Sequence, residues 1–253
     1  MFYTNKITIS MQQVSNSSVE LPIHLCAKTI ARGLTLTVIS LTLAGVLSGY
    51  FWLSEFPFPA SKWFYTLFSL DGEFNIPAWY SAFSLLFCSG LLKVITVIKR
   101  KDSHFSYWKN LYFIFVYLSF DEAFSFHETF IIPSVRQALH LNPIFFQTWV
   151  IPGAILVAVF AFKYLKFWIN LPQKTRYLFF IAAVVYVGGA LGMEMLGGLL
   201  IEDFGRRSFI TLAGIVLEEF LEMAGIVIFL YALITYLSSL KESIRLKIYL
   251  SEK

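Results

Sequence analysis

Residues 208–237 read SFITLAGIVLEEFLEMAGIVIFLYALITYL, and this stretch decides the fold class. As a helix it is long enough to cross a bilayer core of about 30 Å. Its charged residues are Glu218, Glu219 and Glu222. An ionised carboxylate at the centre of a bilayer costs roughly 2.5–3.5 kcal/mol, so acids there usually have a function. The stretch therefore predicts a membrane helix that carries a functional site.

The whole chain has the composition of a membrane protein. Of its 253 residues, 57% are hydrophobic and 14% are charged, whereas a soluble domain has about 25% charged residues. We predict an all-α fold, a polytopic bundle of six transmembrane helices within a domain at 32–237. Tails at 1–31 and 238–253 flank this domain. The predicted spans are 32–53, 78–99, 109–131, 146–169, 177–200 and 208–237.

The loops between these spans differ in charge. The loop KRKDSHFSYWK at 99–109 is basic, as are both tails and the segment 163–176, and all of these fall on one side. The positive-inside rule makes that side cytoplasmic, with both termini inside. We expect an integral protein of a bacterial inner membrane or a thylakoid membrane. The first external loop, at 54–77, is less basic and is expected to hold a short interfacial helix.

Seven of the sixteen acidic residues fall within predicted spans, in the stretches 117–130, 188–198 and 215–225, which contain no Lys or Arg. On an ideal helix Glu218, Glu219 and Glu222 share an arc of about 100°. In DEAFSFHE, residues 121–128, the four polar groups span too wide an arc for one site. We therefore expect either that this helix is distorted or that only part of the set reaches the site.

Orientation places these acids at overlapping depths, from mid-membrane outward, on the third, fifth and sixth spans. Carboxylates are hard, anionic ligands that suit divalent and trivalent cations. The sequence therefore predicts a cation site, with iron or manganese favoured and zinc or calcium left open. The candidate metal ligands are Asp121, Glu122, His127, Glu128, Glu194, Glu218, Glu219 and Glu222.

The segments DEA-x3-HE at 121–128 and LEE-x2-EM at 217–223 resemble segments of uncharacterised multi-pass bacterial membrane proteins. The acids also resemble, more weakly, the di-metal carboxylate sites of ferritin-like bundles. That likeness implies two metal ions and redox chemistry. The pattern departs from it, because His127 follows Phe124 at three residues rather than a Glu, and a second His is missing.

Three functions remain open from the sequence. The first is a metal site, such as a di-metal oxidoreductase acting on a lipid-soluble substrate. The second is a proton-coupled or cation transporter, because intramembrane acids often mark ion pathways. The third is an accessory subunit of a larger complex, such as a pigment-containing one, or a homo-oligomer. Membrane lipids are expected partners. Nucleic acid is not, because the basic residues are dispersed among short loops.

Overall fold

The computed structural model describes residues 26–55 and 59–240, which form helices and turns with no β-strand among them. The six long helical segments are α1 (Ala27–Leu53), α3 (Ile76–Ile98), α4 (Phe105–Phe124), α6 (Val150–Ile169), the joined α7 (Gln173–Val187) and α8 (Glu194–Phe204), and α9 (Phe209–Ser239). Shorter elements are α2 (Ser61–Phe68), α5 (Pro133–Ala138) and the 3-10 turns η1 (Phe126–Phe130) and η2 (Pro143–Phe145). The all-helical prediction is confirmed.

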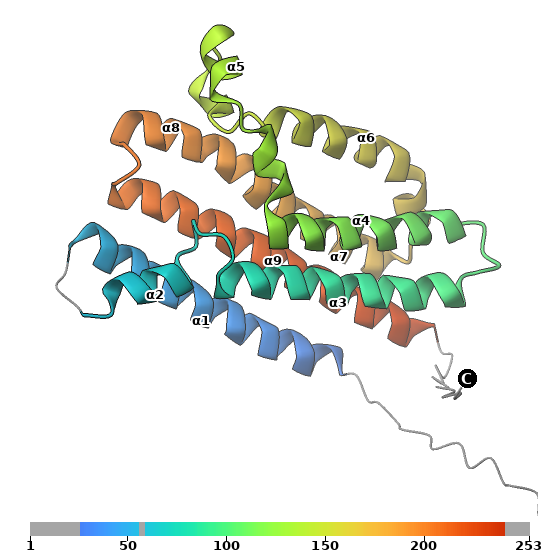
Figure 1. Cartoon of the computed structure of the whole chain (residues 1–253). Helices are drawn as coiled ribbons and strands as arrows, with labels where there is room; N and C mark the ends of the chain where they lie inside the picture. Colours follow the sequence, from blue (N-terminus) through green and yellow to red (C-terminus); the bar gives the residue numbers. More distant parts are fainter. Residues whose placement is uncertain (1–25, 56–58, 241–253) are drawn as a thin grey trace, which may run out of the picture.

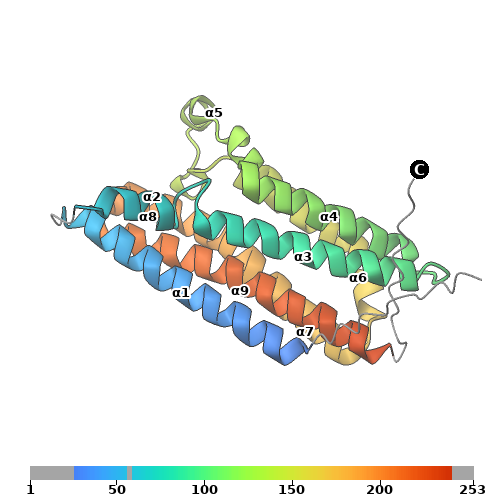
Figure 2. The ribbon, with the colours of Figure 1, turned by 60° about the horizontal axis from the view of Figure 1, so that its bottom comes forward.

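Helix α9 forms the centre of the bundle. It packs against α1, α3, α7 and α8, while α3 pairs closely with α4 (Figures 1 and 2). Leu230 and Leu233 of α9 are fully buried with Leu92 of α3 and Trp108 of α4. A second core cluster joins Met223 of α9 to α1. By contrast, most apolar side chains of α6 are exposed, as is expected for a helix that faces lipid.

The two ends of the bundle differ in what they hold. The α3–α4 turn, the α6–α7 turn and the end of α9 lie at one end (Figure 1), and Lys99, Arg100 and Lys101 lie there. Helix α2, α5 and the α8–α9 turn lie toward the other end. We call these the basic end and the α2 end. The basic end is the one that the positive-inside rule predicts to be cytoplasmic.

Within the described residues, five helices are long and apolar enough to cross a membrane: α1, α3, α6, the α7–α8 helix and α9. The remaining predicted span, 109–131, corresponds to α4, which is not among them. The prediction of a continuous helix to residue 131 is wrong, because α4 ends at Phe124 and η1 follows. The short helix expected in the first external loop is present as α2.

The predicted boundaries shift by a few residues elsewhere. Helix α1 starts at Ala27 and α9 ends at Ser239, so both extend into the predicted tails. The remainder of those tails, at 1–25 and 241–253, lies outside the described residues. Pro152 falls in the first turn of α6, where the missing amide hydrogen leaves no helical bond unmade.

Candidate functional site

Helix α4 breaks beside its acidic residues. Ser125 adopts the left-handed conformation, with φ of 51°, directly after the last residue of α4. A residue with a Cβ atom pays roughly 1–2 kcal/mol for this conformation. The Ser125 Oγ atom is also buried and has no hydrogen-bond partner among the described residues. Backbone strain and an unpaired buried hydroxyl group are typical of functional sites rather than of plain packing.

The break allows Asp121 to hold His127. One carboxylate oxygen of Asp121 accepts a hydrogen bond from the His127 backbone N–H at 2.9 Å. The other lies 2.9 Å from His127 Nδ1. The imidazole ring also packs against Trp149, with ring centroids 4.8 Å apart. Asp121 therefore fixes the ring through Nδ1, which leaves Nε2 as the ring nitrogen that can meet a ligand.

Helix α8 places Glu194 against α9. A π-helical segment, Gly188–Met193, separates α7 from α8 and ends directly before Glu194. Such π segments are rare and often occur at functional sites. Within it, a Cβ atom on Gly189 would lie 3.0 Å from the Glu218 carbonyl oxygen and 3.1 Å from the Glu222 backbone nitrogen. The lack of a side chain at Gly189 therefore lets this segment touch α9 beside the acids.

Two carboxyl groups from these helices lie close to each other. The Glu218 side chain of α9 is within interaction distance of the Glu194 side chain of α8. Two ionised carboxylates repel and have only acceptor atoms, so a direct bond between them would need a shared proton.

Glu122 of α4 joins the acids of α9 at the same level. Glu219 interacts electrostatically with Glu122 and Glu194, and Glu222 interacts with Glu219 and Glu122. Tyr186 of α7 lies within the field of Glu222 and Glu122. We call Glu122, Glu194, Glu218, Glu219 and Glu222 the acid cluster. Each of its members is partly buried.

The turn before α3 brings two further acids toward this cluster. Asn75 shapes the turn, because its Nδ2 donates to the carbonyl oxygens of Ser69 at 2.6 Å and Gly72 at 2.7 Å. Its Oδ1 accepts from the Ala78 N–H and caps α3. Asp71 and Glu73 lie in this turn and interact electrostatically with Glu219. They form an acidic rim on the α2 end of the cluster.

The electrostatic surroundings also affect Asp71 in this turn. Desolvation by the surrounding protein raises the pKa of Asp71, and the nearby charges of Glu194 and Glu73 raise it further, while Arg206 opposes the shift. The sequence places Asp71 and Glu73 in the first external loop, outside every predicted span. Their spacing carries no signal of this position, since it depends on how the turn folds back over α9.

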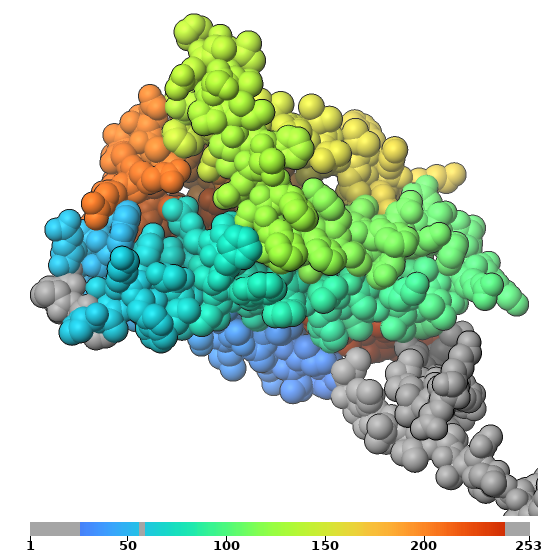
Figure 3. Space-filling model, viewed as in Figure 1, coloured from blue at the N-terminus to red at the C-terminus, as the bar shows by residue number. Residues whose placement is uncertain are grey.

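The structure therefore sorts the predicted ligands into groups. It gathers Glu122, Glu194, Glu218, Glu219 and Glu222, and it pairs Asp121 with His127. Glu128 lies in η1 and is exposed. In Figure 3 the surface is hollowed between α8 and the α4–α5 segment. Among the described residues, no three His, Cys, Asp or Glu side chains stand in an arrangement ready to hold a metal ion.

A family model matches residues 33–237, and its description is Domain of unknown function (DUF8692). The chain belongs to this family. The DUF8692 match covers every acid described above, from Asp71 to Glu222. Comparison with curated proteins and with solved structures found no match for the chain. The family agrees with the resemblance to uncharacterised membrane proteins, while a likeness to ferritin-like proteins is not shown.

Proposed function

We propose that this chain is a membrane protein whose acid cluster, together with His127, binds a metal cation. The observation that carries the proposal is the Asp121–His127 pair. Metal-binding histidines commonly donate a hydrogen bond from their second ring N–H to a carboxylate, which fixes the ring and makes the free nitrogen a better ligand. Here an Asp121 carboxylate oxygen lies 2.9 Å from His127 Nδ1. The Glu122 carboxyl group also interacts electrostatically with the ring.

Charge supports the same conclusion. The acid cluster adds five carboxyl groups from α4, α8 and α9, and Asp71 and Glu73 add two more at its rim. The carboxylates of the cluster would repel one another if all were ionised, and a divalent cation would relieve that repulsion. The unpaired Ser125 hydroxyl group lies beside His127 in the chain and offers a further oxygen to a bound ion or its water.

In this proposal, His127 Nε2, Glu122, Glu219 and Glu222 are the candidate ligands, and the cation itself draws them together. Oxygen-rich sites with one imidazole suit iron, manganese, zinc and calcium. With iron or manganese the site could support oxidation of a lipid-soluble substrate. Such a substrate would reach the cluster laterally from the membrane.

The test is elemental analysis of purified protein with matched variants. Glu219→Gln removes one carboxylate from the cluster, whereas Glu202→Gln removes an exposed carboxylate from the end of α8. We expect stoichiometric metal in the wild type and in Glu202→Gln, and loss of most of it in Glu219→Gln. A folded wild-type protein that binds no divalent metal after dialysis against each candidate ion would refute the proposal.

A second function, proton-coupled transport, is favoured by the close approach of the Glu194 and Glu218 carboxyl groups. A shared proton between two carboxyl groups is the kind of unit from which proton relays in membranes are built. Proton flux into liposomes distinguishes this function from the first. If flux disappears in Glu218→Gln while the wild type remains free of metal, transport replaces the metal site as the function.

A further inference from the structure

A pocket of about 320 Å³ lies at the basic end, far along α9 from the acid cluster. It is formed where the α3–α4 turn, the α6–α7 turn and the last turns of α9 meet. Lys99, Asp102, His104 and Asn170 supply its polar lining. This volume falls in the usual range for small-ligand pockets, about 300–1,000 Å³.

The floor of the pocket is rigid and aromatic. Trp108 stacks on Tyr236 with ring centroids 5.0 Å apart and meets Phe167 edge-on at 4.9 Å. Trp108 is 1% exposed, so it is locked between α4, α6 and α9. Three helices therefore fix the geometry of the pocket without the help of a ligand.

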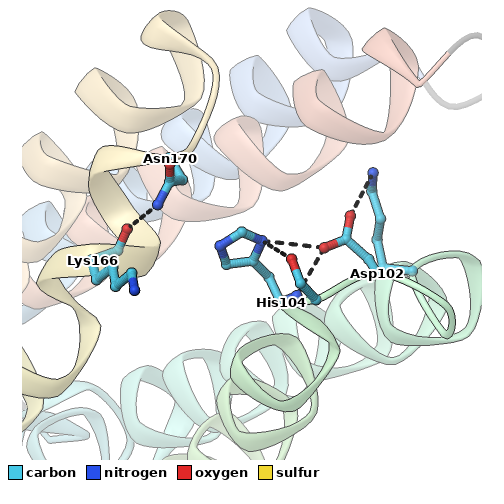
Figure 4. A network of polar contacts seen from close by, with 6 residues as sticks. Asp102, His104, Lys166 and Asn170 are labelled. Atoms are coloured by element: carbon cyan, nitrogen blue, oxygen red, sulfur yellow. Dashed lines mark hydrogen bonds and ion pairs between the residues drawn. The ribbon is translucent and has the colours of Figure 1, made fainter.

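Its rim favours a negative charge. Asp102 is neutralised locally, because Lys99 Nζ lies 3.4 Å from one carboxylate oxygen and the His104 N–H donates to the other at 2.8 Å. Figure 4 shows the His104 ring pointing from Asp102 toward Asn170 and Lys166 of α6. Arg100 and Lys101 lie beside Lys99 in the same turn and are exposed. Lys99 and Asp102 balance within the pocket lining, and the neighbouring Arg100 and Lys101 make the turn as a whole positive.

The starts of two helices add to the positive electrostatic potential at the pocket. Helix α4 begins after His104 and α7 begins after Pro172, and both residues line the pocket. Neither start has a side-chain cap, although the Phe105 N–H of α4 already donates to the Asp102 carbonyl oxygen at 3.0 Å. The first backbone N–H groups of a helix carry partial positive charge and bind anions, above all phosphate.

We propose that this pocket binds a phosphate ester, the headgroup phosphate of an anionic membrane lipid. Lys99 and the starts of α4 and α7 hold the phosphate, and the acyl chains leave along the exposed apolar side of α6. The position supports a lipid source, because the pocket lies at the end of the membrane-crossing helices, where headgroups gather. Basic pockets between membrane helices are known to take such headgroups. This inference is independent of the metal site.

The experiment measures binding of phosphatidylglycerol to the full-length protein in nanodiscs of phosphatidylcholine, by native mass spectrometry. Lys99→Gln should weaken binding about five-fold, the usual effect of one Lys on an anionic lipid. Lys99→Arg should restore it. The control is Lys62→Gln, which makes the same charge change on α2 at the opposite end.

A parallel titration with inorganic phosphate separates the two sources of the phosphate group. Lipid binding that falls in Lys99→Gln, with no binding of inorganic phosphate, assigns the pocket to a lipid headgroup. Binding of inorganic phosphate that is lost in Lys99→Gln assigns it to a soluble phosphate ester. If Lys99→Gln and Lys62→Gln bind lipid and phosphate equally well, the proposal is wrong.

Discussion

At the scale of single residues, the end of α4 shows how one strained position can organise a site. The left-handed backbone at Ser125 turns the chain so that His127 comes back to Asp121, six residues earlier. On a continuous helix the two side chains would point in different directions, because six residues correspond to about 600° of rotation. The strain at Ser125 is thus what makes the carboxylate–histidine pair.

We predict that Asp121→Asn weakens metal binding about 10–100-fold, the usual effect of losing the carboxylate behind a metal-binding histidine. The amide keeps the shape of the side chain but not its charge. Metal affinity can be measured by competition with a chelator. The exposed Asp203→Asn provides the control, and equal affinity in the two variants would contradict a metal-orienting role for Asp121.

Asp71 gives a prediction about pH. Because its pKa is raised in the folded protein, the folded state holds this proton more tightly than the unfolded state does. The contribution of Asp71 to stability is therefore full below its unfolded pKa, and it is lost as pH rises through the folded pKa. We expect the melting temperature of Asp71→Asn to improve relative to wild type as pH rises above the ordinary Asp pKa of about 4. If the melting temperatures of the variant and the wild type change with pH in parallel, the raised pKa of Asp71 is contradicted.

At the scale of elements, the packing of α9 against the α7–α8 helix depends on close contacts at two glycines. Gly189 of the π segment meets the backbone of α9 at Glu218 and Glu222, and Gly225 of α9 meets Tyr186 of α7. The small residues let two backbones approach without a side chain between them. This close contact sets the position of Glu194 relative to Glu218.

We predict that Gly225→Ala destabilises the protein by about 1–3 kcal/mol, the usual cost of overpacking. The new methyl group would lie 2.7 Å from the Tyr186 backbone nitrogen, which cannot move without shifting α7. Gly90→Ala in α3 is the control, since a methyl group there meets nothing within 4 Å. Denaturant unfolding in micelles measures both, and similar stabilities would refute the close-packing argument.

At the scale of the whole molecule, the two ends of the bundle differ in chemistry. The basic end carries Lys99, Arg100, Lys101 and the aromatic pocket, while the α2 end carries Asp71 and Glu73 beside the acid cluster. If the basic end faces the cytoplasm, cations reach the cluster from outside and lipid headgroups reach the pocket from inside.

Cysteine labelling tests this orientation. Cys26 is exposed at the start of α1 on the basic end, and Cys88 is fully buried. A maleimide that does not cross membranes should therefore leave the wild type unlabelled in intact cells and label Cys26 after the membrane is opened. Glu202→Cys, in the α8–α9 region of the opposite end, should be labelled in intact cells. The reverse labelling pattern would show that the basic end faces outward and that the predicted orientation is wrong.

Much of this architecture followed from the sequence because it depends on local properties. Long apolar runs predict helices wherever the backbone must satisfy its own hydrogen bonds in lipid. The shared face of Glu218, Glu219 and Glu222 followed from helical periodicity alone. The wide arc of DEAFSFHE likewise indicated that one regular helix could not direct all its polar groups to a single point, and the break at Ser125 is the distortion that resolves it.

The sequence by itself determined an all-helical membrane fold and the presence of acids in its apolar helices, since both follow from composition and period. Only the tertiary structure decided which acids meet. The Asp121–His127 pair depends on the left-handed Ser125, the approach of Glu194 to Glu218 on the contact at Gly189, and the approach of Asp71 and Glu73 on a turn held by Asn75. The approach of Glu194 to Glu218 joins segments that are distant in the sequence, and the other two contacts depend on local turns that helical periodicity does not specify.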